Sequence, residues 1–279
     1  MSAKGFFTDT TICIGCKACE VACKQWNQLP DDGLEFSGFS YDNTVELGAS
    51  TWRHVAFVER LTPSPGGDAF SWLFSSDVCK HCARAGCLES CPTGAIVRTE
   101  FESVFVQPDI CNGCGYCVVN CPFGVIDRRP EDGRVFKCTL CYDRLKDDLT
   151  PACAKACPTA SIQFGDLDEL RERARRRVGD LHERGVTDAY LYGVDAANQP
   201  GTDGLNAFFL LVDHPEVYNL PPDPVAPAKK AGASWRSMAV AVLGLAAAAL
   251  GAVLASGDGE RTARDAPAAL CAMSTEEPR

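Results

Sequence analysis

The chain has 279 residues, of which 17 are cysteine and only four are histidine. Its 37 acidic residues outnumber its 27 basic residues, and the formal net charge of −10 argues against a nucleic-acid-binding protein, which would present a basic face. The scarcity of histidine excludes histidine-rich metal sites and leaves thiolate as the main metal ligand that the chain offers.

The N-terminal segment 1–13 reads MSAKGFFTDTTIC and contains neither an apolar run nor an arginine pair. We therefore expect no secretory or twin-arginine signal in this segment. The segment ends at Cys13, the first cysteine of a repeated motif.

Sixteen cysteines between positions 13 and 157 form four sets of four. Each set begins C-x2-C and ends C-x3-C, and three of the four sets are followed directly by proline. The repetition of one motif indicates an internal repeat. The sets are Cys13, Cys16, Cys19 and Cys23; Cys79, Cys82, Cys87 and Cys91; Cys111, Cys114, Cys117 and Cys121; and Cys138, Cys141, Cys153 and Cys157.

This spacing is typical of ligands for iron–sulfur cubes. Three closely spaced cysteines wrap a short loop around one cluster, and the fourth cysteine points away to ligate the other cluster of the pair. Sixteen such ligands predict four [4Fe–4S] clusters. Cys271, which lies beyond the motifs, is interpreted as an incidental thiol.

Three other uses of cysteine are weighed against clusters. A zinc ribbon pairs C-x2-C knuckles but rarely places a third cysteine two residues further on. A disulfide framework requires an oxidising compartment and does not repeat this motif. A thioredoxin-like C-x-x-C would occur once.

Between the first two sets, residues 51–60 alternate as in a strand, 64–68 contain a turn, and 69–74 form a second strand, which together predict a hairpin. His54 in the first strand is interpreted as a structural or surface residue. His81, between two cysteines, is expected to cover or tune a cluster, the alternative being a solvated loop residue.

Short apolar runs follow three of the sets, at 93–97, 123–126 and 159–162. In each, a small residue precedes apolar positions, which predicts a turn that leads into a short strand. Such strands would shield the clusters from water.

Residues 166–185 predict a helix whose apolar stripe is formed by Leu167, Leu170, Ala174, Val178 and Leu181. Acidic residues begin it, as suits the helix dipole, and arginines fill its middle. We interpret it as a surface helix packed on the body. The alternative is an arginine face that docks an acidic partner.

A proline-rich linker, 221–234, precedes the run Met238–Ala255, which contains no charge, amide or hydroxyl. As a helix this run is roughly 27 Å long, close to the ~30 Å hydrocarbon core of a bilayer. Trp235 and Arg236 stand where interfacial anchors are expected. We predict one transmembrane helix over 235–256 and a polar tail over 257–279, the alternative being a buried soluble helix.

No G-x-G-x-x-G, P-loop or H-E-x-x-H motif is present, nor a nucleophile and base that the sequence supports as a pair. No catalytic residue is therefore expected. We expect a chain that transfers electrons, and no motif in it indicates a site for a pterin, a flavin or an organic substrate.

Four stretches resemble the four-cluster iron–sulfur subunits of molybdopterin oxidoreductases: TICIGCKACEVACKQWN (11–27), CKHCARAGCLESCPTGAI (79–96), CNGCGYCVVNCPFGV (111–125) and RVFKCTLCYDR (134–144). PACAKACPTASIQFG (151–165), the arginine-rich helix and the terminal span resemble the β subunit of membrane-bound formate dehydrogenase. The resemblance covers nearly the whole chain.

The resemblance implies an α+β fold with two interleaved ferredoxin-like halves and a C-terminal single transmembrane helix. The double ferredoxin-like domain would span 1–165, with 79–125 as its inner half, and 166–234 would pack on the body and on partners. The implied ligands are Cys13, Cys16, Cys19 and Cys157 for cluster 1; Cys79, Cys82, Cys87 and Cys121 for cluster 2; Cys91, Cys111, Cys114 and Cys117 for cluster 3; and Cys23, Cys138, Cys141 and Cys153 for cluster 4.

The resemblance also implies a function and partners. The chain would carry electrons from a catalytic α subunit, whose molybdenum or tungsten pterin oxidises formate, to a membrane γ subunit with haem b that reduces quinone. The implied location is the bacterial inner membrane, with a single pass and the cluster domain in the periplasm. Counting basic residues near the span instead favours the cytoplasm, because Lys229, Lys230 and Arg236 precede it and only Arg261 and Arg264 follow it.

Three alternatives remain open. The chain could be the equivalent four-cluster subunit of a hydrogenase or of a reductase for dimethyl sulfoxide or another sulfur compound. It could be a zinc-binding scaffold, which metal content would reveal. It could also be a soluble ferredoxin-like carrier, which would need no detergent.

Overall fold

The computed structural model describes residues 2–31, 33, 36, 38, 42–44, 46–60 and 71–264. The chain divides into two compact units, Met1–Lys229 and Lys230–Arg279. Residues 166–229 therefore belong to the same unit as the cysteine motifs. The predicted turn 64–68 and Cys271 lie outside the described residues.

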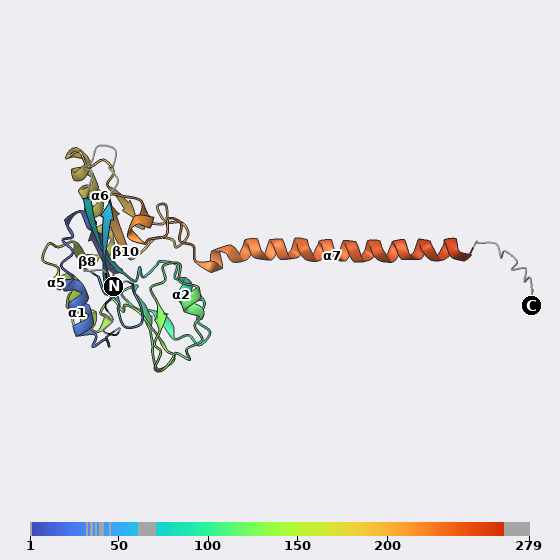
Figure 1. Cartoon of the computed structure of the whole chain (residues 1–279), viewed down its shortest axis with the longest axis horizontal. Helices are drawn as coiled ribbons and strands as arrows, with labels where there is room; N and C mark the ends of the chain where they lie inside the picture. Colours follow the sequence, from blue (N-terminus) through green and yellow to red (C-terminus); the bar gives the residue numbers. More distant parts are fainter. Residues whose placement is uncertain are drawn as a thin grey trace, which may run out of the picture. The chain divides into compact units, whose positions relative to one another are not determined.

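A four-stranded sheet in the order β8-β1-β10-β9 organises the first unit (Figure 1). Strand β1 (Lys4–Asp9) pairs antiparallel with β8 (Ile162–Asp166) and parallel with β10 (Ala207–Leu211), whose other neighbour is β9 (Tyr190–Tyr192). All five residues of β10 are buried and apolar, as expected for a central strand. The N-terminal strand is thus held between two segments from much later in the chain.

Helix α6 (Leu167–Glu183) packs on this sheet and confirms the predicted helix. Four residues of its predicted stripe are buried, namely Leu167, Leu170, Ala174 and Leu181, and Val178 is partly buried against the same core. Because these positions recur at the helical period, one face is apolar and the other is left to charged residues.

The arginines of α6 bond mainly to the body of the protein. Arg177 donates from Nε to Asp9 at 2.9 Å, Arg173 bonds to Gln163 at 3.0 Å and Arg175 bonds to Asp195 at 2.8 Å. Such contacts tie the helix to neighbouring segments and support its interpretation as a packed surface helix.

The predicted hairpin is confirmed by β2 (Arg53–Arg60) and β3 (Ser71–Val78), which pair antiparallel from Arg53↔Val78 to Arg60↔Ser71. Strand β3 continues past the predicted end at 74. His54 is buried, and its Nε2 lies 2.5 Å from Asp42, so its interpretation as a structural residue holds and the surface alternative is wrong.

Short elements connect the cysteines. The helices are α1 (Ala18–Trp26), α2 (Gly86–Glu89), α3 (Tyr116–Val119), α4 (Tyr142–Lys146) and α5 (Ala152–Ala156), and α1 packs against α5. Two small ribbons pair β4 (Ile96–Arg98) with β5 (Val104–Val106), and β6 (Asp127–Arg128) with β7 (Val135–Phe136). The 3-10 turns are η1 (Thr10–Ile12) and η2 (Pro215–Tyr218).

Two of the three predicted short strands are confirmed by β4 and β8, which start at Ile96 and Ile162. The third prediction was wrong in position, since β6 starts only at Asp127. Val125 and Ile126 are buried among the cysteines and fill the core there instead of pairing in a sheet.

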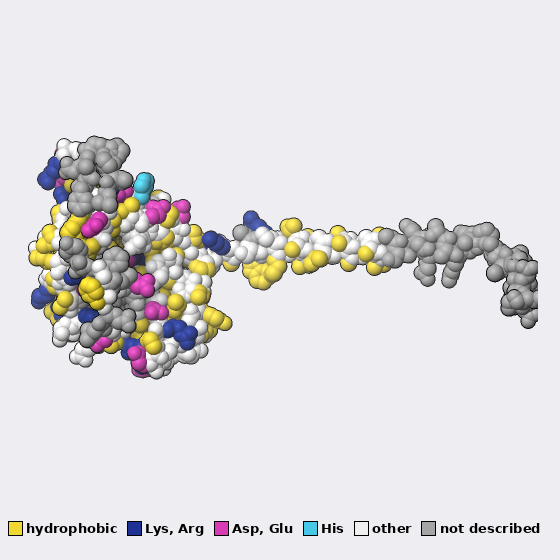
Figure 2. Space-filling view, viewed as in Figure 1, with side chains coloured by type: hydrophobic (Ala, Val, Ile, Leu, Met, Phe, Trp, Pro, Cys, Tyr) yellow, Lys and Arg dark blue, Asp and Glu magenta, His cyan; other side chains and the backbone are white. Residues whose placement is uncertain are grey.

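Helix α7 (Pro227–Arg264) begins inside the predicted linker, which is therefore helical from residue 227. Proline suits the first turn of a helix because its missing N–H has no partner there anyway. The stretch Pro227–Leu254 is long and apolar enough to cross a membrane, with a hydropathy of 2.3 and no burial over its most apolar window. The core helix of a soluble protein would be mostly buried, so the lack of burial disfavours that alternative. Figure 2 shows the visible surface of the apolar run without charged side chains.

Replacing Leu170 by alanine tests the packing of α6. Leu170 is 1% exposed, so the substitution leaves a cavity in the core, and we expect a loss of about 2–5 kcal/mol in the free energy of unfolding. Urea-induced unfolding of the anaerobically purified protein measures it. The control Glu172→Ala, on the exposed face of the same helix, should change stability by less than about 0.5 kcal/mol.

Candidate metal centres

All sixteen cysteines of the four sets are free thiols, so the structure contains no disulfide framework among them. Eight are buried, six are partly buried, and Cys16 and Cys114 are exposed. Within the described ranges no three His, Cys, Asp or Glu side chains converge on a single-ion position.

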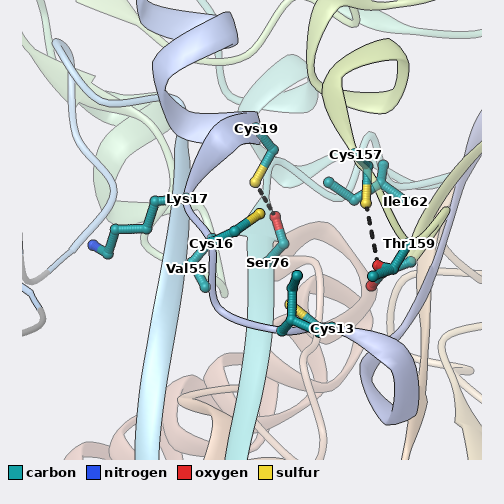
Figure 3. Close-up of a pocket in the computed structure, with 11 residues that line it drawn as sticks. Cys13, Cys16, Lys17, Cys19, Val55, Ser76, Cys157, Thr159 and Ile162 are labelled. Atoms are coloured by element: carbon teal, nitrogen blue, oxygen red, sulfur yellow. Dashed lines mark hydrogen bonds between the residues drawn. The ribbon is translucent and has the colours of Figure 1, made fainter.

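The first group of thiols lies between the N-terminal loop and the segment after α5. Cys13, Cys16, Cys19 and Cys157 line one cavity, and in Figure 3 they lie around a common space. The Cys19 sulfur lies 3.3 Å from the Ser76 hydroxyl. The loop passes so close to the hairpin that a Cβ on Gly15, whose φ is +65°, would lie 2.9 Å from the ring of Phe74.

The second group lines another cavity and consists of Cys79, Cys82, Cys87 and Cys121. His81 lines the same cavity and is 1% exposed, so the alternative of a solvated loop residue is wrong. Its Nδ1 accepts a hydrogen bond from the Val104 N–H at 3.1 Å, while Nε2 has no partner among the described residues. Burial lowers the pKa of His81 well below its usual value, and nearby Lys137 adds to this effect.

The state of His81 follows from these contacts. A neutral imidazole that accepts at Nδ1 carries its proton on Nε2. This N–H is therefore free to donate to a sulfur-bearing group in the cavity, as the sequence interpretation of a covering or tuning residue requires.

We define two further groups by the thiols whose charges act on Cys117 and on Cys23. Burial, followed by Cys111, Cys114 and Cys91, raises the pKa of Cys117 to about 11.

The fourth group surrounds Cys23. Burial, followed by Cys138, Cys153 and Cys141, raises the pKa of Cys23 well above its usual value. At this group the backbone is left-handed at two successive non-glycine residues, Leu140 (φ 61°) and Cys141 (φ 51°). Such strained conformations persist where the surrounding structure enforces them, often at functional sites.

The two cavities each hold three cysteines of one motif and one of another, namely Cys13, Cys16 and Cys19 with Cys157, and Cys79, Cys82 and Cys87 with Cys121. The role of each thiol as a ligand remains a prediction.

The electrostatics of the groups suit a metal cluster. Burial raises the pKa of Cys19 and of Cys141 to about 11 and that of Cys87 to about 12, so these thiols are neutral unless positive charge compensates them. Buried cations lie close by, since Arg53 and Lys137 are 1% and 2% exposed and have cysteines as their main charged neighbours. Four thiols around an apolar space beside a buried cation fit a cysteine-bound [4Fe–4S] cluster.

Sequence reasoning missed three residues of these sites: Arg53, Ser76 and Lys137. Arg53 and Ser76 lie in strands where charged and hydroxyl side chains ordinarily face solvent. Only the position of Lys137 directly before Cys138 was a usable signal, because a cation beside a buried ligand compensates its negative charge.

The fold and the thiol groups define a protein of the iron–sulfur class. Two family models described as 4Fe-4S dicluster domains match residues 70–167 and 12–95. With sixteen cysteines, these matches correspond to four [4Fe–4S] clusters.

Comparison with known proteins identifies the family within this class. The chain is 43% identical to the formate dehydrogenase iron–sulfur subunit of Haemophilus influenzae over 77% of this chain and 68% of that protein. It is 41% identical to the iron–sulfur subunit of the nitrate-inducible formate dehydrogenase of Escherichia coli over 77% of this chain and 71% of that protein. The B subunit of the anaerobic dimethyl sulfoxide reductase of Escherichia coli is 34% identical over 63% of this chain and 78% of that protein. The chain belongs to the family of formate dehydrogenase iron–sulfur subunits.

Metal analysis of the anaerobically purified protein tests the nature of the centres. We expect about sixteen iron atoms and no zinc per chain, because four cubes contain four irons each. About four to eight zinc atoms per chain, with little iron, would show instead that the thiols form zinc sites. A Cys271→Ala protein is the control, and its iron content should be unchanged.

Proposed function

We propose that this chain carries electrons from a formate-oxidising α subunit, which holds a molybdenum or tungsten pterin, to a membrane γ subunit that holds haem b and reduces quinone. The observation that supports this proposal is the succession of four thiol groups through one body, from one exposed cysteine to another. The relatives named above make formate the favoured substrate of the complex.

In this proposal the four groups are the ligand sets. Cluster 1 is held by Cys13, Cys16, Cys19 and Cys157; cluster 2 by Cys79, Cys82, Cys87 and Cys121; cluster 3 by Cys91, Cys111, Cys114 and Cys117; and cluster 4 by Cys23, Cys138, Cys141 and Cys153. Residues 1–165 then form two ferredoxin-like halves with interleaved ligands, with 79–125 as the inner half. Each cluster, when bound, exchanges one electron at a time.

The electrostatic neighbours of single thiols support an order of the clusters. The charge of the Cys153 sulfur interacts with Cys19, so clusters 1 and 4 are neighbours. The charge of Cys79 interacts with Cys138, so clusters 4 and 2 are neighbours. The charge of Cys117 interacts with Cys87, so clusters 2 and 3 are neighbours. The order is therefore 1–4–2–3, and electron transfer needs only steps between neighbours.

The two ends of this series lie at the surface. Exposed Cys16 of cluster 1 has exposed apolar neighbours in Ile14 and Val21, which are 58% and 68% exposed. Exposed Cys114 of cluster 3 lies in the same motif as Tyr116 and Val119, which are 58% and 81% exposed. Apolar side chains left in water mark surfaces for partner proteins, and we assign one end to each partner subunit.

Helix α7 is proposed to anchor the complex as a single pass through the bacterial inner membrane, with the cluster domain on the periplasmic side. Its span contains no ionisable residue between Met238 and Ala255, so it relays no protons itself. Gly244, Ala248 and Gly251 lie on one helical face and would let helices of the γ subunit approach closely.

The similarity to a dimethyl sulfoxide reductase subunit supports one alternative, in which the chain serves a reductase of that type. The large subunit that copurifies with the chain decides between the two. A formate-oxidising pterin subunit supports the proposal, and a reductase subunit contradicts it.

Replacing Cys19 by serine tests the route of electrons. We expect the loss of one cluster signal in electron paramagnetic resonance (EPR) spectra and of formate-to-quinone electron flow, because a cluster of the series is missing. Reduction of an artificial dye by the α subunit should survive, since it does not need this chain.

The control for this experiment is Cys271→Ala, which should leave both activities intact. Equal loss of quinone and dye reduction in Cys19→Ser, with a complex of normal composition, would contradict the role of the chain as the route between the two partners.

Deletion of residues 236–279 tests the anchor. It removes the apolar run, so we expect the α subunit and the truncated chain to appear in the detergent-free soluble extract and quinone reduction to be lost. Retention of the truncated pair in washed membranes would show that the span is not the anchor. A chain that ends after residue 264 keeps the run and should stay in the membrane.

A further inference from the structure

Arg53, the first residue of β2, is a buried cation without a carboxylate partner among the described residues. It is 1% exposed, and no ion pair involves it among the described residues. Its Nη1 donates to the Ser76 hydroxyl at 3.0 Å and to the Ser76 carbonyl at 3.3 Å, and its guanidinium lies 4.9 Å from the centre of the Phe6 ring.

Two donors of this guanidinium, Nε and Nη2, are buried and have no hydrogen-bond partner in the described part of the chain. A buried donor of a charged group that makes no hydrogen bond is costly, so such atoms point to a missing acceptor. The guanidinium stays protonated under all ordinary conditions, so the missing acceptor is electron-rich.

The neighbours of Arg53 identify the acceptor by its chemistry. The charges that act most strongly on it are the sulfurs of Cys153, Cys19, Cys138 and Cys23. Cys19 belongs to the cluster 1 group, and the other three belong to the cluster 4 group. The geometry agrees, because the Ser76 hydroxyl touches both the guanidinium and the Cys19 sulfur, and Arg53 lines one cavity together with Cys23. The guanidinium therefore lies at the junction between the two groups.

We propose that Arg53 sets the reduction potentials of clusters 1 and 4 together, by donating its free N–H groups to sulfur at their junction and by placing a fixed positive charge between them. This inference rests on the ligand sets of the proposed function. Arg53 neither gains nor loses an electron itself. It acts on the clusters through its charge and its hydrogen bonds and is therefore a positioning residue.

The sign of the effect follows from the charge balance. Reduction adds one electron to a cluster and makes its site more negative by one charge. A fixed cation stabilises the reduced form more than the oxidised form, so it raises the potential of each cluster nearby. Raising both potentials together keeps the step between clusters 1 and 4 nearly level, which favours transfer in either direction.

Lys137 offers an internal comparison at the next junction. Its strongest cysteine neighbours are Cys79, Cys87 and Cys138, which belong to the cluster 2 and cluster 4 groups. Unlike Arg53, whose Nε and Nη2 have no acceptor in the described part of the chain, Lys137 has its nitrogen satisfied, since Nζ donates to the carbonyls of Val104 and Cys138. Removal of Lys137 should therefore affect a different pair of clusters.

The experiment is a redox titration of the purified membrane complex, with dithionite as reductant and EPR spectra as the readout. In Arg53→Met we expect two of the four cluster signals to shift to lower potential by at least tenfold in the reduction equilibrium, which is 59 mV for one electron. The cluster 3 signal, identified by its absence from Cys91→Ser, should not move. In Lys137→Met the cluster 2 signal should move and the cluster 1 signal should not.

Two further variants separate charge from hydrogen bonding. Arg53→Lys keeps the charge and should retain most of the wild-type potential, whereas Arg53→Gln keeps a donor without charge and should resemble Arg53→Met. The matched control is Arg176→Met on the exposed face of α6, which should leave all four potentials unchanged.

Four assembled clusters with wild-type potentials in Arg53→Met or Arg53→Gln would overturn the inference. If Arg53→Met fails to assemble, Arg53→Gln and Arg53→Lys decide, and loss of clusters in all three would show that Arg53 is structural. A wild-type complex without four iron–sulfur signals would instead contradict the proposed function.

Discussion

The structure depends on its buried cysteine side chains and on the positive charge that they require when they bind metal as thiolates. Eight of the sixteen motif thiols are buried, and burial raises the pKa of several of them, so as free groups they are neutral. Binding a cluster requires thiolate, and thiolate in a low-dielectric interior requires cations. The metal supplies part of that charge and the buried side chains of Arg53 and Lys137 supply more. A chain with a formal charge of −10 thus keeps some of its few cations inside.

The same requirement explains the topology. The cavity lined by Cys13, Cys16, Cys19 and Cys157 joins residues from the two ends of the cysteine-rich region. The pairing of β1 with β8 brings these ends together, and the parallel pairing of β1 with β10 covers the other side. Metal binding and the closure of the body are therefore coupled, because the groups do not exist in the unfolded chain.

Much of the local structure was predictable. The stripe of α6, the hairpin of β2 and β3, and the apolar run within α7 follow from the period of apolar residues, which local geometry determines. The errors were also local in origin. Helix α7 starts at Pro227, inside the predicted linker, since proline is accepted in a first helical turn, and β6 starts only at Asp127, after the predicted run 123–126.

The chemistry can be read from the order of residues: repeated cysteine spacing specifies cluster-binding loops, and an uncharged run of membrane length specifies a candidate span. Which side chains meet depends instead on how the chain folds. Three features depend on contacts between residues far apart in the chain: Cys157 joins the first three cysteines, His81 is buried with no partner for Nε2 in the described part of the chain, and Arg53 lies beside the thiols of Cys19 and Cys153. The alternation of a strand shows that the Arg53 side chain lies on the opposite face from those of its sequence neighbours. Which face of the strand is buried depends on packing.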